Sequence, residues 1–250
     1  MSQVVYTPII DYKKSIFYYS ANVLSDALLD EVSQWLAQQS YIDGHCGLSG
    51  KQSSLSGKQS GLSGKQSSLS GKQSSLSGKQ IPRQQLWFQK DNKYFCREWK
   101  ARYDRWEPQK EYPKLLDRIM RVLIEHIKPI LDKHNLEIPA INSCLINKYR
   151  DGNDSIRAHR DTYLSFGETP VIIGVSVGES RILRVRKLHN PEVFKSLKVE
   201  RESDETIDFV LENNSIFVMA GYSQTYFSHE VPKMKHKGIR YSLTFREYIV

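Results

Sequence analysis

Short β-rich segments separated by turn signals fill the second half of the chain, and they narrow the choice of fold more than any other feature. From residue 141 onward these segments are INSCLINKY, PVIIGVSV, RILRVRKL, TIDFVL, SIFVMA and RYSLTFREY, with the turn formers DGND, VGES, HNPE and ENNS between them. Many short strands that follow helices favour two packed sheets. The pattern therefore predicts an α+β fold, with a double-stranded β-helix (jelly-roll) core and the N-terminal helices packed outside.

Two amphipathic helices are expected before the β-rich region. Ser25 is a typical N-cap, and apolar residues recur at helical spacing over 26–38. A second helix is expected over about 113–131, and Pro129 should kink or end it. A short strand is expected at 15–20. These elements are predicted to serve as scaffold.

A seven-residue repeat interrupts the N-terminal part. LSGKQSS recurs with leucines at positions 48, 55, 62, 69 and 76. One apolar residue per unit cannot bury enough area to offset the entropy of the chain, so the repeat predicts a disordered insertion in a surface loop. Its lysines could instead add weak affinity for nucleic acid. We therefore divide the chain into 1–47, the insertion 48–80, and 81–250.

Composition sets broad limits on the class of protein. No apolar run among the 250 residues is long enough to span a bilayer, and the N-terminus lacks the pattern of a secretion signal. Three cysteines without a CxxC pair fit a reducing compartment. We therefore expect an intracellular protein of the nucleus or cytoplasm, neither secreted nor bound to a membrane. The net charge is +8, but five of these charges are lysines of the repeat, so bulk charge says little about partners.

Cations and aromatic rings alternate between residues 81 and 112. This window holds eight basic and eight aromatic residues, Arg83, Trp87 and Tyr94 among them. Cations beside flat rings are typical of a surface that binds single-stranded nucleic acid or a flipped base. The same window holds five acidic residues, so the aromatics could equally be core and the cations a solvated face.

A candidate metal site begins at His159-x-Asp161. Side chains alternate along extended backbone, so this spacing places an imidazole and a carboxylate on the same side. One more imidazole, from His229 in YFSHEVP, would complete a set of two histidines and one carboxylate. That set leaves open positions on Fe(II) for a bidentate cosubstrate and O2.

The last strand carries two arginines on one face. Arg240, Ser242, Thr244 and Arg246 alternate with Tyr241, Leu243 and Phe245. Buried arginines are costly without anions, and guanidinium groups bind carboxylates with a forked geometry. A dicarboxylate that spans from the metal to the sheet would account for both arginines. Alternatively, the two arginines lie on a surface that faces solvent.

These motifs together resemble the AlkB family of Fe(II)/2-oxoglutarate-dependent dioxygenases, which oxidatively dealkylate nucleobases. The resemblance runs from about residue 81 to 248. It is carried by Pro82-Arg83, Asn147-x-Tyr149, Asp151-Gly152, His159-x-Asp161, Gly221-x-x-Gln224, His229 and the segment from Arg240 to Arg246.

The resemblance implies a role for each matched residue. Iron would be held by His159, Asp161 and His229. Arg240 would pair with the far carboxylate of 2-oxoglutarate beside Tyr149, while Asn147 and Arg246 would complete the pocket near the iron, with Ser242 on the same strand. The stretch 81–106 would be a nucleotide-recognition lid, with Arg83, Trp87 and Tyr94 in contact with nucleic acid.

Three departures from the family pattern bear on the substrate. Thr162-Tyr163-Leu164 follows the His-x-Asp motif, where members that repair alkylated bases carry acidic residues that help to hold a cationic base. Ser242 stands where several members have Asn, and Asn213-Asn214-Ser215 replaces the usual Gly-Asp turn.

We expect a monomeric enzyme that demethylates bases of the 1-methyladenine or 3-methylcytosine type in DNA or RNA, with Fe(II), 2-oxoglutarate and O2. One alternative is a 2-oxoglutarate oxygenase that acts on protein or another substrate. A second, of a different class, is a nucleic-acid-binding module without catalysis.

Overall fold

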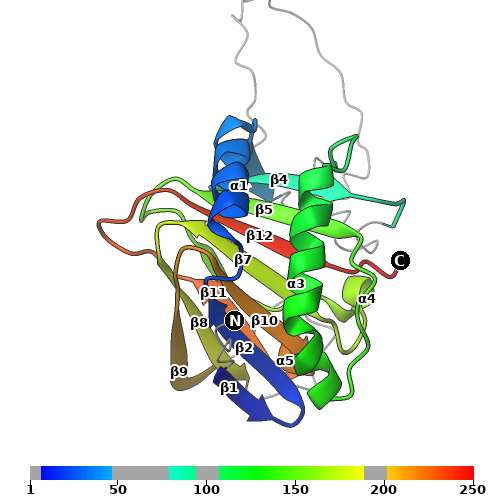
Figure 1. Cartoon of the computed structure of the whole chain (residues 1–250). Helices are drawn as coiled ribbons and strands as arrows, with labels where there is room; N and C mark the ends of the chain where they lie inside the picture. The colour runs from blue at the N-terminus through cyan, green and yellow to red at the C-terminus, as the bar shows by residue number, and fades with distance from the viewer. Residues whose placement is uncertain (1–6, 47–78, 94–106, 189–201) are drawn as a thin grey trace, which may run out of the picture.

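Two antiparallel sheets form the body of the protein in a computed structural model, which describes residues 7–46, 79–93, 107–188 and 202–250 (Figure 1). The larger sheet has the strand order β1-β2-β10-β7-β12-β5-β4-β3, and the smaller has the order β6-β11-β8-β9. The larger sheet consists of β1 (Thr7–Tyr12), β2 (Ser15–Ala21), β3 (Ile42–Cys46), β4 (Lys79–Gln89), β5 (Ser143–Tyr149), β7 (Ile172–Gly178), β10 (Ser215–Gly221) and β12 (Arg240–Arg246). The smaller consists of β6 (Ile156–His159), β8 (Arg181–Leu188), β9 (Glu202–Leu211) and β11 (Phe227–Val231). This arrangement is consistent with the predicted jelly roll.

Two long helices lie across one face of the larger sheet (Figure 1). The first, α1 (Asp26–Gln38), begins where the Ser25 hydroxyl accepts a hydrogen bond from the Leu28 amide at 3.4 Å. The second, α3 (Lys114–Lys133), continues through Pro129 instead of ending there. Ile130 and Leu131 are buried beyond the proline, so packing favours the last turn despite the missing backbone donor. Two single-turn helices, α4 (Tyr163–Phe166) and α5 (Ser223–Tyr226), connect strands.

Alternation along the strands divides the core into two layers. In β10, Ile216 and Val218 belong to the cluster that also contains apolar residues of α1 and α3, such as Val32. Phe217 and Met219 point the other way and pack with residues of the smaller sheet. Every residue of β10 is buried, because the larger sheet is covered on both faces. The second cluster lies between the two sheets, which is where the candidate site forms.

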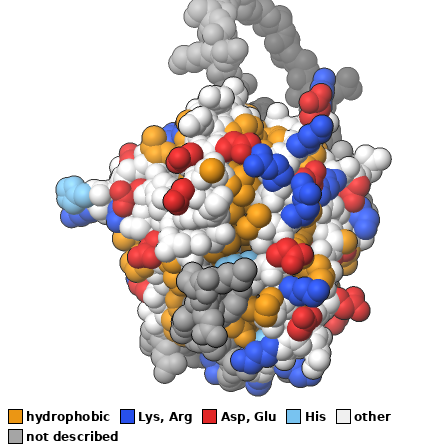
Figure 2. All heavy atoms as spheres, in the orientation of Figure 1, with side chains coloured by type: hydrophobic (Ala, Val, Ile, Leu, Met, Phe, Trp, Pro, Cys, Tyr) orange, Lys and Arg blue, Asp and Glu red, His pale blue; other side chains and the backbone are white. Residues whose placement is uncertain are grey.

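Charged side chains of both signs are interspersed on the face that carries the two long helices (Figure 2). Ion pairs join several of them, including Lys90 to Asp117 and Arg118 to Glu31, both at 2.6 Å. This face is therefore not a one-signed basic patch of the kind that binds nucleic acid electrostatically. Among the described residues, no helix is both long and apolar enough to cross a membrane.

Candidate metal and cosubstrate site

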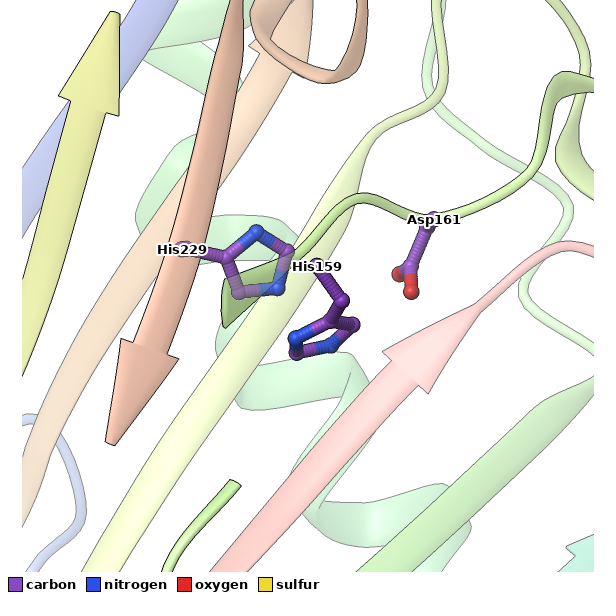
Figure 3. Close-up of side chains that lie close together, drawn as sticks. All are labelled: His159, Asp161 and His229. Carbon is purple, nitrogen blue, oxygen red and sulfur yellow. The ribbon is translucent and has the colours of Figure 1, made fainter. Parts of the chain in front are cut away.

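Three side chains converge between the sheets. His159 is the last residue of β6 and lies directly opposite His229 of β11 in the antiparallel register. Asp161 follows β6 by two residues and turns its carboxylate toward the two rings (Figure 3). The potential ligand atoms of the three residues all lie within 4.8 Å of one another. The structure thus brings together the three residues that the sequence predicts as metal ligands.

Neighbouring groups orient each ligand. The Nδ1 of His159 lies 2.8 Å from the carbonyl oxygen of Arg157. A carbonyl can only accept, so Nδ1 carries the proton and Nε2 keeps a lone pair for a metal. The Asp161 amide donates to Oε1 of Gln224 at 2.8 Å, and Nε of Arg246 donates to Oδ2 of Asp161 at 2.7 Å.

The same surroundings set the protonation of the three ligands. Burial lowers the pKa of His159 despite the opposing effect of Asp161, and burial together with the charge of His159 lowers the pKa of His229 to about 3. Burial opposes the charge on Asp161, but Arg246 and the two imidazoles outweigh it and lower the pKa of that carboxyl. Two neutral imidazoles and one carboxylate are the forms that bind a metal ion.

A cavity extends from His159 and His229 along β12 and β5. Arg240, Ser242, Thr244 and Arg246 line it from β12, while Tyr241, Leu243 and Phe245 point into the core beneath the helices. Asn147 and Tyr149 of β5 line it beside their register partners Ser242 and Arg240. Arg240 is 1% exposed and Arg246 is 8% exposed. The alternative that these arginines face solvent is therefore wrong.

Arg240 retains unused hydrogen-bond donors inside this cavity. Its Nη2 donates to Oγ of Ser176 at 2.8 Å, whereas Nε and Nη1 have no hydrogen-bond partner among the described residues. Burial lowers the pKa of Arg240 to about 10, so the group is still a cation at neutral pH. A buried cation with two unused donors fits a carboxylate, which can accept both.

Asn147 is held from behind by two side chains of β4. Its Oδ1 accepts from Nε of Arg83 at 2.8 Å and from Nε2 of Gln85 at 2.9 Å. Arg83 also donates to the carbonyl of Ser155 at 3.2 Å. The oxygen of the amide is thus engaged by donors, which fixes which way the Asn147 side chain is turned.

The three residues expected to contact nucleic acid do not gather on one described surface. Arg83 is buried against Asn147, and Trp87 is 4% exposed and packs with Phe166 and Tyr248. A buried indole offers no ring face for a base to stack on. Trp87 is therefore a core residue of β4, which agrees with the alternative that the aromatic residues of 81–112 belong to the core. Tyr94 lies outside the described residues, as does most of the expected lid.

Several residues that support the site have no role that the sequence pattern indicates. Gln224 belongs to the Gly221-x-x-Gln224 motif, which implies no function for it, and Gln85 lies two residues from Arg83 on the same face of β4. Ser176 becomes relevant only through the pairing of β7 with β12, where it lies opposite Ser242. No pattern in the sequence reveals that cross-strand pairing.

The fold and the site together define the class of protein to which this chain belongs. A facial set of two histidines and one carboxylate, set between two antiparallel sheets and next to a buried arginine pocket, is the arrangement of a non-haem iron oxygenase with an anionic cosubstrate.

The comparisons identify the family. The chain belongs to the 2OG-Fe(II) oxygenase superfamily, whose family model matches residues 51–246. The two imidazoles and the carboxylate fit the Fe(II) of the family's name, and the unused donors of the buried Arg240 fit a carboxylate of 2-oxoglutarate. The resemblance to AlkB is confirmed by the relatives that the chain matches.

Curated relatives agree with this assignment, and a solved structure shares the fold. The chain is 34% identical to DNA oxidative demethylase ALKBH2 of Arabidopsis thaliana over 134 residues, which are 48% of this chain and 42% of the relative. It is 32% identical to alpha-ketoglutarate-dependent dioxygenase alkB homolog 3 of Homo sapiens over 142 residues, or 54% and 48% of the two chains. The solved structure of OsALKBH1 shares the fold, with a TM-score of 0.52 at 16% identity, over 92% of this chain and 97% of the other. The matches span about half of the length of the curated relatives or less.

Proposed function

We propose that this protein oxidatively demethylates nucleobases of the 1-methyladenine or 3-methylcytosine type in DNA or RNA. The single observation that carries the oxygenase part is the convergence of His159, Asp161 and His229 beside the buried Arg240. The nucleobase part is supported by the relatives, which are named as a DNA oxidative demethylase and as alkB homologues.

Each residue of the cavity then has a task. Iron bound by His159, Asp161 and His229 would supply, with 2-oxoglutarate and O2, the hydroxylation of an N-methyl carbon. Arg240 and Tyr149 would hold the far carboxylate of the cosubstrate, with Ser242 beside them. Asn147 and Arg246 would contact its other end, and Arg246 keeps Asp161 ionised through their 2.7 Å hydrogen bond. The hydroxylated methyl group would then leave the base as formaldehyde.

The rim beside the iron site favours a second candidate, an oxygenase that acts on protein or another substrate without a cationic base. Thr162 caps α4 through a 3.3 Å hydrogen bond from the Leu164 amide to its hydroxyl, and Leu164 is exposed. No acidic side chain is therefore present at these positions to attract a cationic base. The similarity to a DNA oxidative demethylase and to alkB homologues supports the first candidate more strongly. Methylated oligonucleotides distinguish the two candidates.

Three further parts of the proposal concern the rest of the chain. The lid would include Tyr94 and the stretch up to residue 106. The repeat 48–80 would be an insertion in a loop of the catalytic domain that 1–47 and 81–250 form. All described residues of the site come from one chain, so a monomer would suffice for activity.

The test offers methylated DNA and RNA oligonucleotides to protein loaded anaerobically with Fe(II) and 2-oxoglutarate, then exposed to air. Mass spectrometry of the strands should show the loss of one methylene unit from 1-methyladenine or 3-methylcytosine. His159→Ala should abolish this loss but keep the affinity for the strand. His236→Ala, which alters an exposed loop histidine, should still show the loss of the methylene unit. Succinate with every strand unchanged would instead favour the second candidate. If the protein binds the strands but forms no succinate, it is a nucleic-acid-binding module without catalysis.

A further inference from the structure

A second buried arginine, Arg181, lies behind the wall of the cosubstrate cavity. It begins β8 in the smaller sheet and is 0% exposed. Its Nη1 donates to the carbonyl of Asp151 at 3.1 Å, and its Nη2 donates to the carbonyls of Asp154 and Pro232, each at 2.7 Å. Carbonyl dipoles satisfy these donors, but they bring no net negative charge to the guanidinium.

Arg181 and Arg240 meet at one aromatic ring. The guanidinium carbon of Arg181 lies 5.4 Å from the centre of the Tyr149 ring, and that of Arg240 lies 5.2 Å from it. Both distances are in the range in which a cation is attracted to an aromatic face. Tyr149 and Arg240 are register partners in the larger sheet, while Arg181 reaches the ring from the smaller one. The position of this ring therefore depends on contacts from both sheets.

The positive charge at this end of the cavity is not balanced by a paired carboxylate. In the part of the chain that the structure describes, neither Arg181 nor Arg240 takes part in an ion pair. Asp154 lies close enough to act on the Arg181 guanidinium, but Arg150 donates to both of its carboxylate oxygens at 2.8 Å, so Asp154 offsets only part of the Arg181 charge. Two buried cations near one ring are costly unless an anion binds close to them. The cavity reaches Tyr149 and Arg240, so this end is where an anion would be stabilised most.

We propose that Arg181 is a positioning residue for the cosubstrate, which holds the Tyr149 ring beside Arg240 and adds a second positive charge where the far carboxylate binds. This inference rests on the arrangement of 2-oxoglutarate in the proposed function. It makes the cavity selective for a dicarboxylate, because a 2-oxo acid with a single carboxylate leaves the charge of both arginines uncompensated.

Equilibrium binding tests this role without turnover. Calorimetry on the full chain loaded with Mn(II) would give the Kd for 2-oxoglutarate and for 2-oxopentanoate, which has the same chain length but lacks the far carboxylate. Arg181→Met should raise the Kd for 2-oxoglutarate by about tenfold, or about 1.4 kcal/mol, and change the Kd for 2-oxopentanoate much less. Arg181→Lys should fall between wild type and Met, because it keeps the charge but not the three carbonyl contacts. In turnover with Fe(II), the KM for 2-oxoglutarate should rise while kcat stays near that of wild type.

Arg184→Met is the matched control. It removes another arginine of β8, whose ion pairs are with Asp208 and Glu230 and not with a group at the Tyr149 ring, so the Kd for 2-oxoglutarate should remain that of wild type. An unchanged Kd in Arg181→Met, even with a lower melting temperature, would show that Arg181 only ties the loops together and would overturn the inference. If Arg181→Met does not fold, the same criterion applies to Arg181→Lys. If wild-type protein itself does not bind 2-oxoglutarate, the proposed function is wrong. If wild type binds it and Arg181→Met binds it equally well, only the role of Arg181 is wrong.

Discussion

Arg246 is the residue on which the carboxylate ligand most depends. Its guanidinium lies 5.4 Å from the centre of the Phe166 ring and donates to Asp161, and both partners are buried. Removal of the cation would leave a buried carboxylate unpaired and would favour its protonated form, which binds metal poorly.

We therefore expect Arg246→Met to weaken Mn(II) binding by roughly 10- to 100-fold, the usual effect of the loss of a group that orients a metal ligand. Titration of the metal-free protein with Mn(II) measures this. Arg184→Met is the control, because Arg184 forms a comparable 2.7 Å pair with Asp208 in the smaller sheet, in a partly exposed position. Equal Mn(II) affinity in Arg246→Met and wild type would contradict the role given to Arg246.

At the scale of elements, the hairpin of β3 and β4 determines what the repeat can do to the fold. Cys46 pairs with Lys79 in the register of these two strands, so the two ends of 47–78 leave the sheet side by side. A segment whose ends are adjacent can be long or short at little cost, because the entropy of loop closure grows only with the logarithm of length.

Replacement of residues 47–78 by a Gly-Ser loop of about eight residues should therefore raise the free energy of unfolding by only about 1.2 kcal/mol, because each halving of loop length contributes about 0.6 kcal/mol. Mn(II) affinity should also stay unchanged, because His159, Asp161 and His229 all lie outside the segment. Urea denaturation of the two proteins, followed by Mn(II) titration, provides the test. A large loss of stability would mean that the repeat packs on the domain and is not an insertion.

Helix α3 carries a pH dependence of its own. Burial lowers the pKa of His126 below its ordinary value of 6.5. Between the folded pKa and 6.5 the unfolded chain therefore binds more protons than the folded one, so stability falls as pH decreases through this window. His126→Gln should flatten the dependence of unfolding free energy on pH there, by up to about 1.4 kcal/mol per pH unit. Denaturation at several pH values would measure it, and parallel curves for the two proteins would refute the assignment.

On the scale of the whole molecule, the sequence predicts where helices and strands lie better than it predicts which of them pair or pack together. Residues 26–38 form α1 as expected, and the strand expected at 15–20 is β2 (Ser15–Ala21), because capping and periodicity are local signals. The stretch around Trp87 shows where local signals fail. Cations and rings suggested a surface, but residues 84–89 of β4 pair with β5, with Trp87 opposite Leu145, so the ring becomes core. The three metal ligands were predictable from residue type and order, whereas Arg181 and Ser176 were not, because only the pairing and packing of strands bring them to the site.

The measurement that tests the central claim most directly is the joint yield of succinate and formaldehyde from a 1-methyladenine or 3-methylcytosine oligonucleotide. If the buried cavity binds 2-oxoglutarate and the three ligands hold iron beside a methylated base, the two products should appear in equal amounts. Both should be absent in Asp161→Ala. Succinate without formaldehyde from every methylated strand, or formaldehyde that persists in Asp161→Ala, would contradict nucleobase demethylation at this site.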